Sequence, residues 1–261
     1  MTVRLADKIG IKKIIETAND FGLNDGLNNE LSMSLGSGLV NLLDITNSYG
    51  IIANGGIETS PTIITSIYSK NGKRLYNSNT KTCDNCKTEK ILNSFREPLI
   101  NNNTRTVVDP TIAYQITSMM EGVVKRGTAK NLKDLNVPIA GKTGTTNDNK
   151  DAWFIGFTPN LVVGIFVGYD KPKSLGYKKT GSSVAVPIFK IFAENIEINN
   201  NKIPFRIPSG ISFVKINPKT GMPSTDETSI LEPYLIGTEP YMQNINIIDS
   251  LGSMKNNSIR A

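Results

Sequence analysis

Residues 139–157 read IAGKTGTTNDNKDAWFIGF and predict a short strand followed by a turn and a second strand. Successive side chains of a strand alternate between its faces, so Thr143 and Thr145 share one face while Lys142 and Gly144 share the other. Two hydroxyls beside a flexible ammonium suit an anionic group such as a carboxylate. Gly144 has no Cβ, so another backbone or a ligand can come close there. The stretch therefore indicates an anion-binding strand.

Helices and a further strand are predicted on either side of this stretch. Asp109 is a favourable N-cap, Pro110 suits the first helical position, and Gly127 ends the helix. The apolar positions that we assign to the buried face of this helix are Ile112, Ile116, Met119, Met120, Val123 and Val124. Residues 161–169 predict an apolar strand covered on both faces, and residues 184–196 an amphipathic helix over the sheet.

The N-terminal part is predicted to be helical and to lead into a hairpin. Apolar residues at helical spacing predict two short amphipathic helices, broken near Gly10 and closed by Gly22. Another helix is predicted over residues 40–53. Residues 63–76 form two β-rich arms around an Asn-Gly pair, which is a strong signal for a hairpin.

Both cysteines lie in the polar segment 77–103, as Cys83-Asp84-Asn85-Cys86. The sequence has no second Cys pair and no histidine to complete a metal site, and no βαβ pattern typical of a redox fold surrounds the motif. We interpret them as two thiols in an exposed loop. A disulfide between them is the alternative in an oxidising compartment.

Composition narrows the classes of function. The 29 basic and 23 acidic residues give a net charge of +6, but the basic residues are scattered, and neither an arginine-rich arm nor a row of aromatic residues suggests nucleic acid as a partner. The absence of histidine excludes a Ser-His-Asp triad and a His-dependent metal site, so no metal or cofactor is expected and a nucleophile would need a Lys as its base. No apolar run approaches the ~18 residues of a membrane span. Without a signal peptide, the chain alone is expected in the cytoplasm.

Several segments, in the same order, resemble one known family. Residues 142–170, KTGTTNDNKDAWFIGFTPNLVVGIFVGYD, resemble the third active-site motif and following hairpin of the penicillin-binding transpeptidases. The likeness is closest to the bifunctional class A glycosyltransferase/transpeptidases that build bacterial cell wall. Residues 31–61, 109–132 and 181–192 resemble the segment between the second and third motifs, the helix before the Lys-Thr-Gly strand, and the C-terminal helix of that domain. The likeness covers about residues 1–196.

The resemblance implies a fold and a set of roles. The fold is α/β (α+β), the penicillin-binding-protein/β-lactamase-like transpeptidase fold, in an incomplete form: about three of its five antiparallel strands, with flanking helices. In the family, the Ser of Ser-x-x-Lys attacks the D-Ala-D-Ala carbonyl. Carried over by match, Lys142 tunes the proton network, and Thr143 and Thr145 hold the terminal carboxylate. The backbone N–H of Thr145 faces the oxyanion, and Gly144 leaves room for the nucleophile's helix.

The two earlier family motifs are expected outside this chain. The opening MTVRLADKIG resembles the residues that directly follow Ser-x-Asn, so Ser-x-x-Lys and Ser-x-Asn are both expected upstream of Met1, and the chain alone is expected to be inactive. Ser212 and Lys215 spell Ser-x-x-Lys, but in a strand their side chains point to opposite faces. Ser69-Lys70-Asn71 spells Ser-x-Asn, but at a hairpin tip.

Two domains are predicted: residues 1–196, the C-terminal part of the transpeptidase domain, and residues 197–261, a Pro- and Asn-rich, partly disordered extension. Within the extension we predict a strand over residues 211–216 that returns past residues 218–221, and a weakly ordered tail beyond Glu227.

Three functional hypotheses follow from the resemblance. The chain is a fragment of a D,D-transpeptidase, half of a split enzyme with a separate N-terminal partner, or a non-catalytic module that binds D-Ala-terminated peptides. By family, the expected partners are peptidoglycan stem peptides ending in D-Ala-D-Ala and β-lactams, and the expected location is the periplasmic face of the inner membrane. The apolar strand 161–169 is expected to present an exposed edge.

Overall fold

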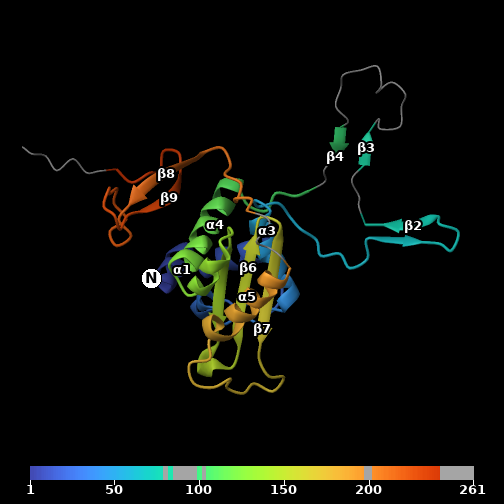
Figure 1. Cartoon of the computed structure of the whole chain (residues 1–261), viewed down its shortest axis with the longest axis horizontal. Helices are drawn as coiled ribbons and strands as arrows, with labels where there is room; N and C mark the ends of the chain where they lie inside the picture. Colours follow the sequence, from blue (N-terminus) through green and yellow to red (C-terminus); the bar gives the residue numbers. More distant parts are fainter. Residues whose placement is uncertain (79–81, 85–98, 102–103, 197–201, 242–261) are drawn as a thin grey trace, which may run out of the picture. The chain divides into compact units, whose positions relative to one another are not determined.

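The structure is a computed structural model that describes residues 1–78, 82–84, 99–101, 104–196 and 202–241 (Figure 1). The chain divides into two compact units, Met1–Arg206 and Ile207–Ala261. This division lies ten residues beyond the predicted domain boundary at residue 196. Phe205 accounts for the difference, because its ring packs edge-to-face on Phe157 with centroids 5.6 Å apart and so belongs to the core of the first unit.

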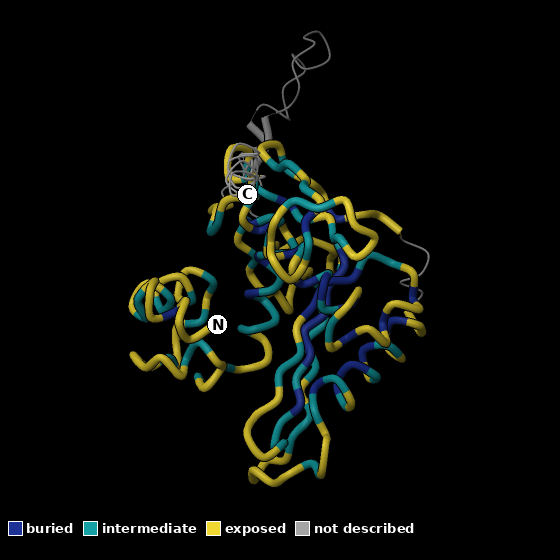
Figure 2. Tube along the Cα trace, turned by 90° about the vertical axis from the view of Figure 1, so that its left-hand side faces the viewer, coloured by how far each residue is buried: buried dark blue, intermediate teal, exposed yellow. Residues whose placement is uncertain are grey.

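A three-stranded antiparallel sheet forms the centre of the first unit. It consists of β5 (Ala140–Thr145), β6 (Ala152–Thr158) and β7 (Leu161–Val167), in that order. The β5–β6 register is unbroken from Ala140↔Phe157 to Thr145↔Ala152. Buried residues lie along these strands and on one side of a helix beside the sheet, drawn in dark blue in Figure 2. The prediction that this chain supplies about three strands of the family's sheet is confirmed for the described residues.

The first face of the sheet is covered by the π-helical turn η5 (Gly181–Ala185), the helix α5 (Val186–Asn195) and the 3-10 helix η3 (Lys130–Leu135). Phe154 of β6 meets Phe189 of α5 edge-to-face, with centroids 5.1 Å apart and both side chains fully buried. Burying such a ring stabilises the fold by about 1.5–3 kcal/mol relative to leaving it exposed. Residues 184–196 were predicted to form a helix over the sheet, and this prediction is confirmed.

The second face is covered by α3 (Leu42–Ala53) and α4 (Pro110–Lys125). Met120, Ala140, Phe157 and Phe205 form its core, and Tyr49 of α3 meets the Phe157 ring at 6.4 Å. Burial raises the pKa of Tyr49 to about 12. Asp109 caps α4 as predicted, because its side chain accepts a hydrogen bond from the N–H of Thr111.

The predicted buried face of α4 is wrong for three of its residues. Ile112, Ile116 and Met119 are exposed by 43%, 38% and 61%. The buried positions are instead Ala113, Thr117, Met120, Gly122 and Val124. Thr117 can be buried because its hydroxyl donates to the carbonyl of Ala113 at 2.9 Å. An apolar stripe of α4 therefore remains exposed.

β7 also differs from its prediction. Its residues are half-buried rather than covered on both faces, and Phe166 is 43% exposed. The reason is topological: β7 is the last strand of the sheet, and no other strand in the described ranges pairs with its outer side. The predicted exposed edge is confirmed for this part of the chain.

The N-terminal elements follow the predicted pattern. The helices α1 (Thr2–Ile9) and α2 (Ile11–Asp20) are separated at Gly10, whose φ of 90° suits glycine. The 3-10 helix η1 (Leu31–Leu35) packs against α1. Among the described helices, none is both long and apolar enough to cross a bilayer.

Short β-ladders lie in the described residues of the middle of the chain. β1 (Ser66–Tyr68) and β2 (Arg74–Asn77) form the predicted hairpin, with Gly72 at a φ of 75°. The interpretation of the cysteine segment as a loop is wrong in part, because β3 (Thr82–Asp84) pairs with β4 (Leu99–Asn101). The backbone of Cys83 lies in β3, whereas Cys86 lies outside the described residues.

Within residues 207–241, the second unit forms a hairpin. The predicted strand is confirmed as β8 (Ile211–Ile216), but its main partner is β9 (Ile230–Leu235). The predicted immediate return past residues 218–221 is limited to one bridge between Ile216 and Pro223. Residues 230–235, predicted to lie in a weakly ordered tail, therefore form a strand, while residues 242–261 lie outside the described part.

Candidate functional site

The end of β5 brings together the four residues that the sequence singles out. Thr143 lies opposite Phe154, whose ring packs on α5, so Thr143 and Thr145 face the α5 side of the sheet. Their hydroxyls meet different neighbours there: Thr143 Oγ1 lies 2.8 Å from Thr128 Oγ1, and Thr145 Oγ1 accepts from the N–H of Gly181 at 3.0 Å. The predicted pairing of the two threonines on one face is confirmed.

Gly181 fits against β5 and β6 only because it has no side chain. A Cβ at this position would lie 2.4 Å from the carbonyl oxygen of Trp153 and 2.5 Å from that of Gly144. This close approach depends on the missing side chain of Gly181, whereas a Cβ on Gly144 would meet only Trp153, so the approach predicted at Gly144 itself stays a prediction. Thr180 caps η5 through a reciprocal pair of hydrogen bonds with Ser183, which fixes the chain entering this contact.

The hydroxyls retain donors for a ligand. A hydroxyl has one hydrogen to donate, and its oxygen can also accept. Because Thr145 Oγ1 accepts from Gly181, its own hydrogen remains available to a bound anion. In the Thr143–Thr128 pair one hydroxyl donates to the other, so one hydrogen of that pair is also available. Two O–H donors thus lie at one end of β5.

Thr128 and Gly181 are absent from the sequence prediction. They lie 15 and 36 residues from the threonines that they contact. Thr128 is held in turn by Ser182, whose hydroxyl donates to the Thr128 carbonyl oxygen. Gly127, which ends the predicted helix, and the Thr-Gly-Ser-Ser run at 180–183 mark turns, but neither pattern identifies the contact partner.

Lys142 lies on the opposite face from the threonines and is exposed. Its Nζ donates to the carbonyl oxygen of Thr143 at 2.7 Å. An ammonium has three donors, so two remain for a neighbouring group or ligand. The positive charge therefore lies beside the outer edge of β5.

The open edge of β5 also presents backbone donors. In an antiparallel pair, opposite residues alternate between those that exchange N–H···O bonds and those whose polar groups point away from the partner strand. Thr146 donates to the carbonyl of Asp151 at 3.2 Å, so this pair belongs to the bonded set. Because the register is unbroken, the N–H groups of Thr143 and Thr145 point away from β6. The Thr145 N–H thus lies on the open edge, near the hydroxyls.

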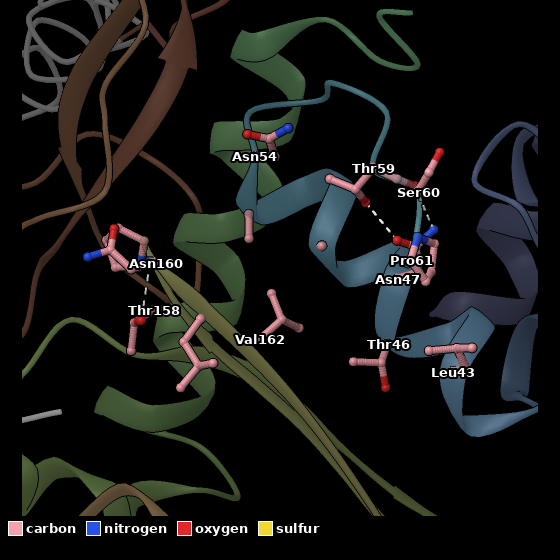
Figure 3. A pocket seen from close by; sticks show the side chains of 14 residues that line it. Leu43, Thr46, Asn47, Asn54, Thr59, Ser60, Pro61, Thr158, Asn160 and Val162 are labelled. Carbon is pink, nitrogen blue, oxygen red and sulfur yellow. Dashed lines mark hydrogen bonds between the residues drawn. The ribbon is translucent and has the colours of Figure 1, made fainter. Parts of the chain in front are cut away.

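A separate depression of about 450 Å³ lies between α3 and the β6–β7 turn (Figure 3). The strand register places that turn at the opposite end of the sheet from Thr145. None of its lining residues is charged. The side-chain amide of Asn47 is already bonded to Thr59: it accepts from the Thr59 hydroxyl at 2.7 Å and donates to the Thr59 carbonyl at 3.0 Å. This depression offers no chemistry comparable to that of β5.

The Ser-x-x-Lys matches do not form a nucleophile–base pair in the described residues. Ser212 and Lys215 lie in β8 at strand spacing and so point to opposite faces, and the Ser212 hydroxyl donates to Glu239. This interaction lowers the pKa of Glu239. A further match that the sequence prediction overlooked, Ser78 to Lys81, runs into residues outside the described part.

Comparison with known proteins extends these observations. The family model described as penicillin binding protein transpeptidase domain matches residues 1–194. The chain is similar to penicillin-binding protein 1A of Rickettsia bellii, with 42% identity over 237 residues, which cover 90% of this chain and 30% of that protein. It is also similar to penicillin-binding protein 1A of Neisseria flavescens, with 34% identity over 81% of this chain and 25% of that protein.

Among solved structures, the crystal structure of penicillin-binding protein 1A from Haemophilus influenzae superposes with a TM-score of 0.77 and 26% identity. The match covers 92% of this chain and 39% of that one. PonA1 from Mycobacterium tuberculosis, at 21% identity and a TM-score of 0.57, shares the fold. The chain spans about 30% of the length of the Rickettsia relative.

Proposed function

Because this chain belongs to the penicillin-binding protein transpeptidase domain family, we propose that β5 is the carboxylate-binding strand of a D,D-transpeptidase that cross-links bacterial peptidoglycan. One observation carries the proposal: the open edge of β5 presents the Thr145 N–H beside the available hydroxyl hydrogens. The substrates are stem peptides ending in D-Ala-D-Ala, with β-lactams as their analogues. The site of action is the periplasmic face of the inner membrane.

The terminal carboxylate of the stem peptide binds to the hydroxyls. A carboxylate is an acceptor-only group that offers about four lone-pair positions. Thr145 supplies one O–H, and the Thr143–Thr128 pair supplies a second. Lys142 adds positive charge at the same edge. Charge-assisted hydrogen bonds of this kind are stronger than neutral ones, which favours a carboxylate over a neutral end group.

The Thr145 N–H then meets the carbonyl oxygen of the scissile bond. A serine oxygen attacks that carbonyl carbon, its proton passes to a lysine, and the developing oxyanion accepts from the Thr145 N–H. The C–N bond to the last D-Ala breaks, the lysine returns the proton to the leaving nitrogen, and D-Ala departs as a free amine. The amine of a second stem peptide then attacks the acyl-serine, and its proton passes through the lysine to the departing serine oxygen. We propose that the serine, its lysine and the Ser-x-Asn relay are supplied from outside residues 1–261.

A second candidate is a site assembled from two separate chains. The exposed edge of β7, with Phe166 43% exposed, and the uncovered apolar stripe on α4 favour it. An N-terminal partner that adds strands to β7 would cover the edge and deliver the nucleophile. Co-expression should then restore covalent labelling by a fluorescent penicillin, and labelling should fall when Lys142 is replaced by Ala. Failure of the two pieces to associate at micromolar concentration would reject this candidate.

The main proposal is tested by calorimetry with a D-Ala-D-Ala-terminated peptide and the chain alone. Saturable binding is expected, with a large loss in Thr145→Ala and near-retention in Thr145→Ser, because serine keeps the hydroxyl. Thr62→Ala, at an exposed position between α3 and β1, is the matched control and should bind as the parent does. Equal binding by Thr145→Ala and the parent would contradict the proposal. Binding without any penicillin labelling is also what a non-catalytic peptide-binding module would show.

A further inference from the structure

The loop between β7 and η5 is strongly basic. Residues 169–180 read YDKPKSLGYKKT, with four lysines and a single acidic residue, Asp170. The side chains of all four lysines, Lys171, Lys173, Lys178 and Lys179, are exposed. A positive segment of this density attracts anions.

This loop is fastened to the turn that follows the candidate strand. The N–H of Leu175 donates to the carbonyl oxygen of Asn149 at 2.8 Å, and the Asn149 amide donates to the carbonyl of Gly176 at 3.4 Å. Asn149 belongs to η4 (Asn147–Asn149), in the turn between β5 and β6. The loop is therefore a fixed neighbour of the site on β5.

Two of the lysines are positioned by aromatic rings. Lys178 Nζ lies 5.1 Å from the centre of the Tyr177 ring, and Lys173 Nζ lies 5.8 Å from that of Tyr169. The backbone of Lys178 has a φ of 58°, a conformation that residues other than Gly, Asn and Asp rarely adopt. Its carbonyl accepts from the Ser183 hydroxyl at 2.9 Å, which holds this backbone in place. The ammonium groups are thus placed on rings while they remain exposed to solvent.

Two acidic side chains near the loop have partners outside it. Asp148 pairs with Lys150 at 3.4 Å. The Asp151 carboxylate accepts a hydrogen bond from the Thr146 hydroxyl at 3.1 Å. No ion pair among the described residues joins a loop lysine to Asp170 or to another carboxylate, so the four ammonium groups are available to an external anion.

The loop ends at the proposed carboxylate site. Gly181, which contacts the Thr145 hydroxyl, is three residues beyond Lys178, and three extended residues span at most about 10 Å. A bound peptide covers the same distance in about three residues. A group two residues before its C-terminus can therefore reach the Lys178 end of the loop.

We propose that Lys173 and Lys178 bind a second carboxylate of the peptide, carried by a residue that precedes the terminal D-Ala-D-Ala. This inference rests on the proposed function of β5 and narrows its substrate class to stem peptides with a free side-chain carboxylate. The basic loop and the threonines together form a two-point anion site, in which the terminal carboxylate binds to hydroxyls and the second one to ammonium groups.

The test compares acetyl-Glu-D-Ala-D-Ala with its isosteric amide, acetyl-Gln-D-Ala-D-Ala, on the chain of residues 1–261. Binding is followed through the fluorescence of Trp153, the single tryptophan, which lies opposite Gly144. We expect the Glu peptide to bind about three- to tenfold more tightly, with the advantage lost in Lys173→Gln/Lys178→Gln and reduced by salt. Lys12→Gln/Lys13→Gln, at exposed positions of α2, makes the same charge change and should keep the advantage.

The outcomes separate this inference from the proposed function. Equal affinity for the two peptides, with Thr145→Ala still weakening both, would overturn the second-carboxylate site and leave the proposed function standing. An advantage that the α2 control loses as well would also overturn it, because net charge alone would then explain the preference. Binding of neither peptide at millimolar concentration would reject both proposals.

Discussion

Replacing Gly181 with alanine adds one atom, the Cβ, where η5 packs against β5 and β6. The added Cβ would lie 2.4 Å from one backbone oxygen and 2.5 Å from another, where ordinary contact begins at 3.4 Å. Neither oxygen belongs to a flexible side chain, so η5 must move by about 1 Å, which is the shortfall in the closer contact. The same movement stretches the 3.0 Å contact between the Gly181 N–H and Thr145 Oγ1 to about 4 Å, beyond hydrogen-bond range.

Two costs follow from this movement. Overpacking of this kind costs about 1–3 kcal/mol, and the lost hydrogen bond about 1 kcal/mol, so Gly181→Ala should lower the free energy of unfolding by roughly 2–4 kcal/mol. Urea unfolding followed by Trp153 fluorescence measures this directly as a shift of the midpoint at unchanged slope. Affinity for a D-Ala-D-Ala peptide should fall as well, because the Thr145 hydroxyl is no longer fixed.

Gly50→Ala is the matched control. Gly50 lies within α3, and a Cβ there would lie 3.3 Å from the Thr59 hydroxyl oxygen, only about 0.1 Å short of ordinary contact. Alanine is favoured over glycine in a helix by about 0.5–1 kcal/mol, so this variant should unfold at the same urea concentration as the parent or slightly above it. A Gly181→Ala protein that unfolds with the parent's midpoint would refute the reasoning.

Three further predictions concern the core and the helix cap. Tyr49→Phe should remove a loss of stability at alkaline pH. Because burial raises the pKa of Tyr49 to about 12, its contribution of roughly 2–3 kcal/mol is fully present below pH 10 and is lost as the pH rises to 12. Measurements of the free energy of unfolding between pH 10 and 12 would reveal the difference between the variant and the parent. Phe189→Ala should cost about 3–5 kcal/mol in urea unfolding, whereas Ile191→Ala, at an exposed position of the same helix, should cost far less. Hydrogen bonds from Thr111 lower the pKa of Asp109, so the ionised side chain stabilises the fold above the ordinary pKa of 3.8, and this stability is lost as the pH falls through the folded-state pKa. Asp109→Asn should therefore make the stability less dependent on pH in this acidic range, as followed by circular dichroism.

Local signals carried much of the fold. The cap at Asp109, the turn glycine at Gly72 and the alternating residues of β5 each act over a few neighbours, so sequence reasoning located them. The orientation of α4 could not be found in this way, because Ile112 and Met120 are equally apolar. The buried face instead includes Ala113, Thr117 and Gly122, whose residue types do not mark core positions.

Long-range contacts account for the remaining differences. β9 was missed because Pro233 lowers the strand tendency of its segment; the structure accommodates this proline opposite Phe213 in a two-stranded hairpin. At the site, the residue types on β5 indicated an anion, but the contacts of Thr145 with Gly181 and of Thr143 with Thr128 arise only when the chain folds back on itself.

The bond between Thr145 and Gly181 also limits the mutational routes open to this strand. One oxygen atom anchors η5 and, in the proposed function, lies beside the ligand. A replacement that removes this oxygen alters ligand selection and leaves the Gly181 amide without its acceptor, so a change of specificity is coupled to a loss of stability at the same position. Directed evolution of ligand preference should therefore recover Thr145→Ser early, and other replacements only together with compensating changes around Thr180.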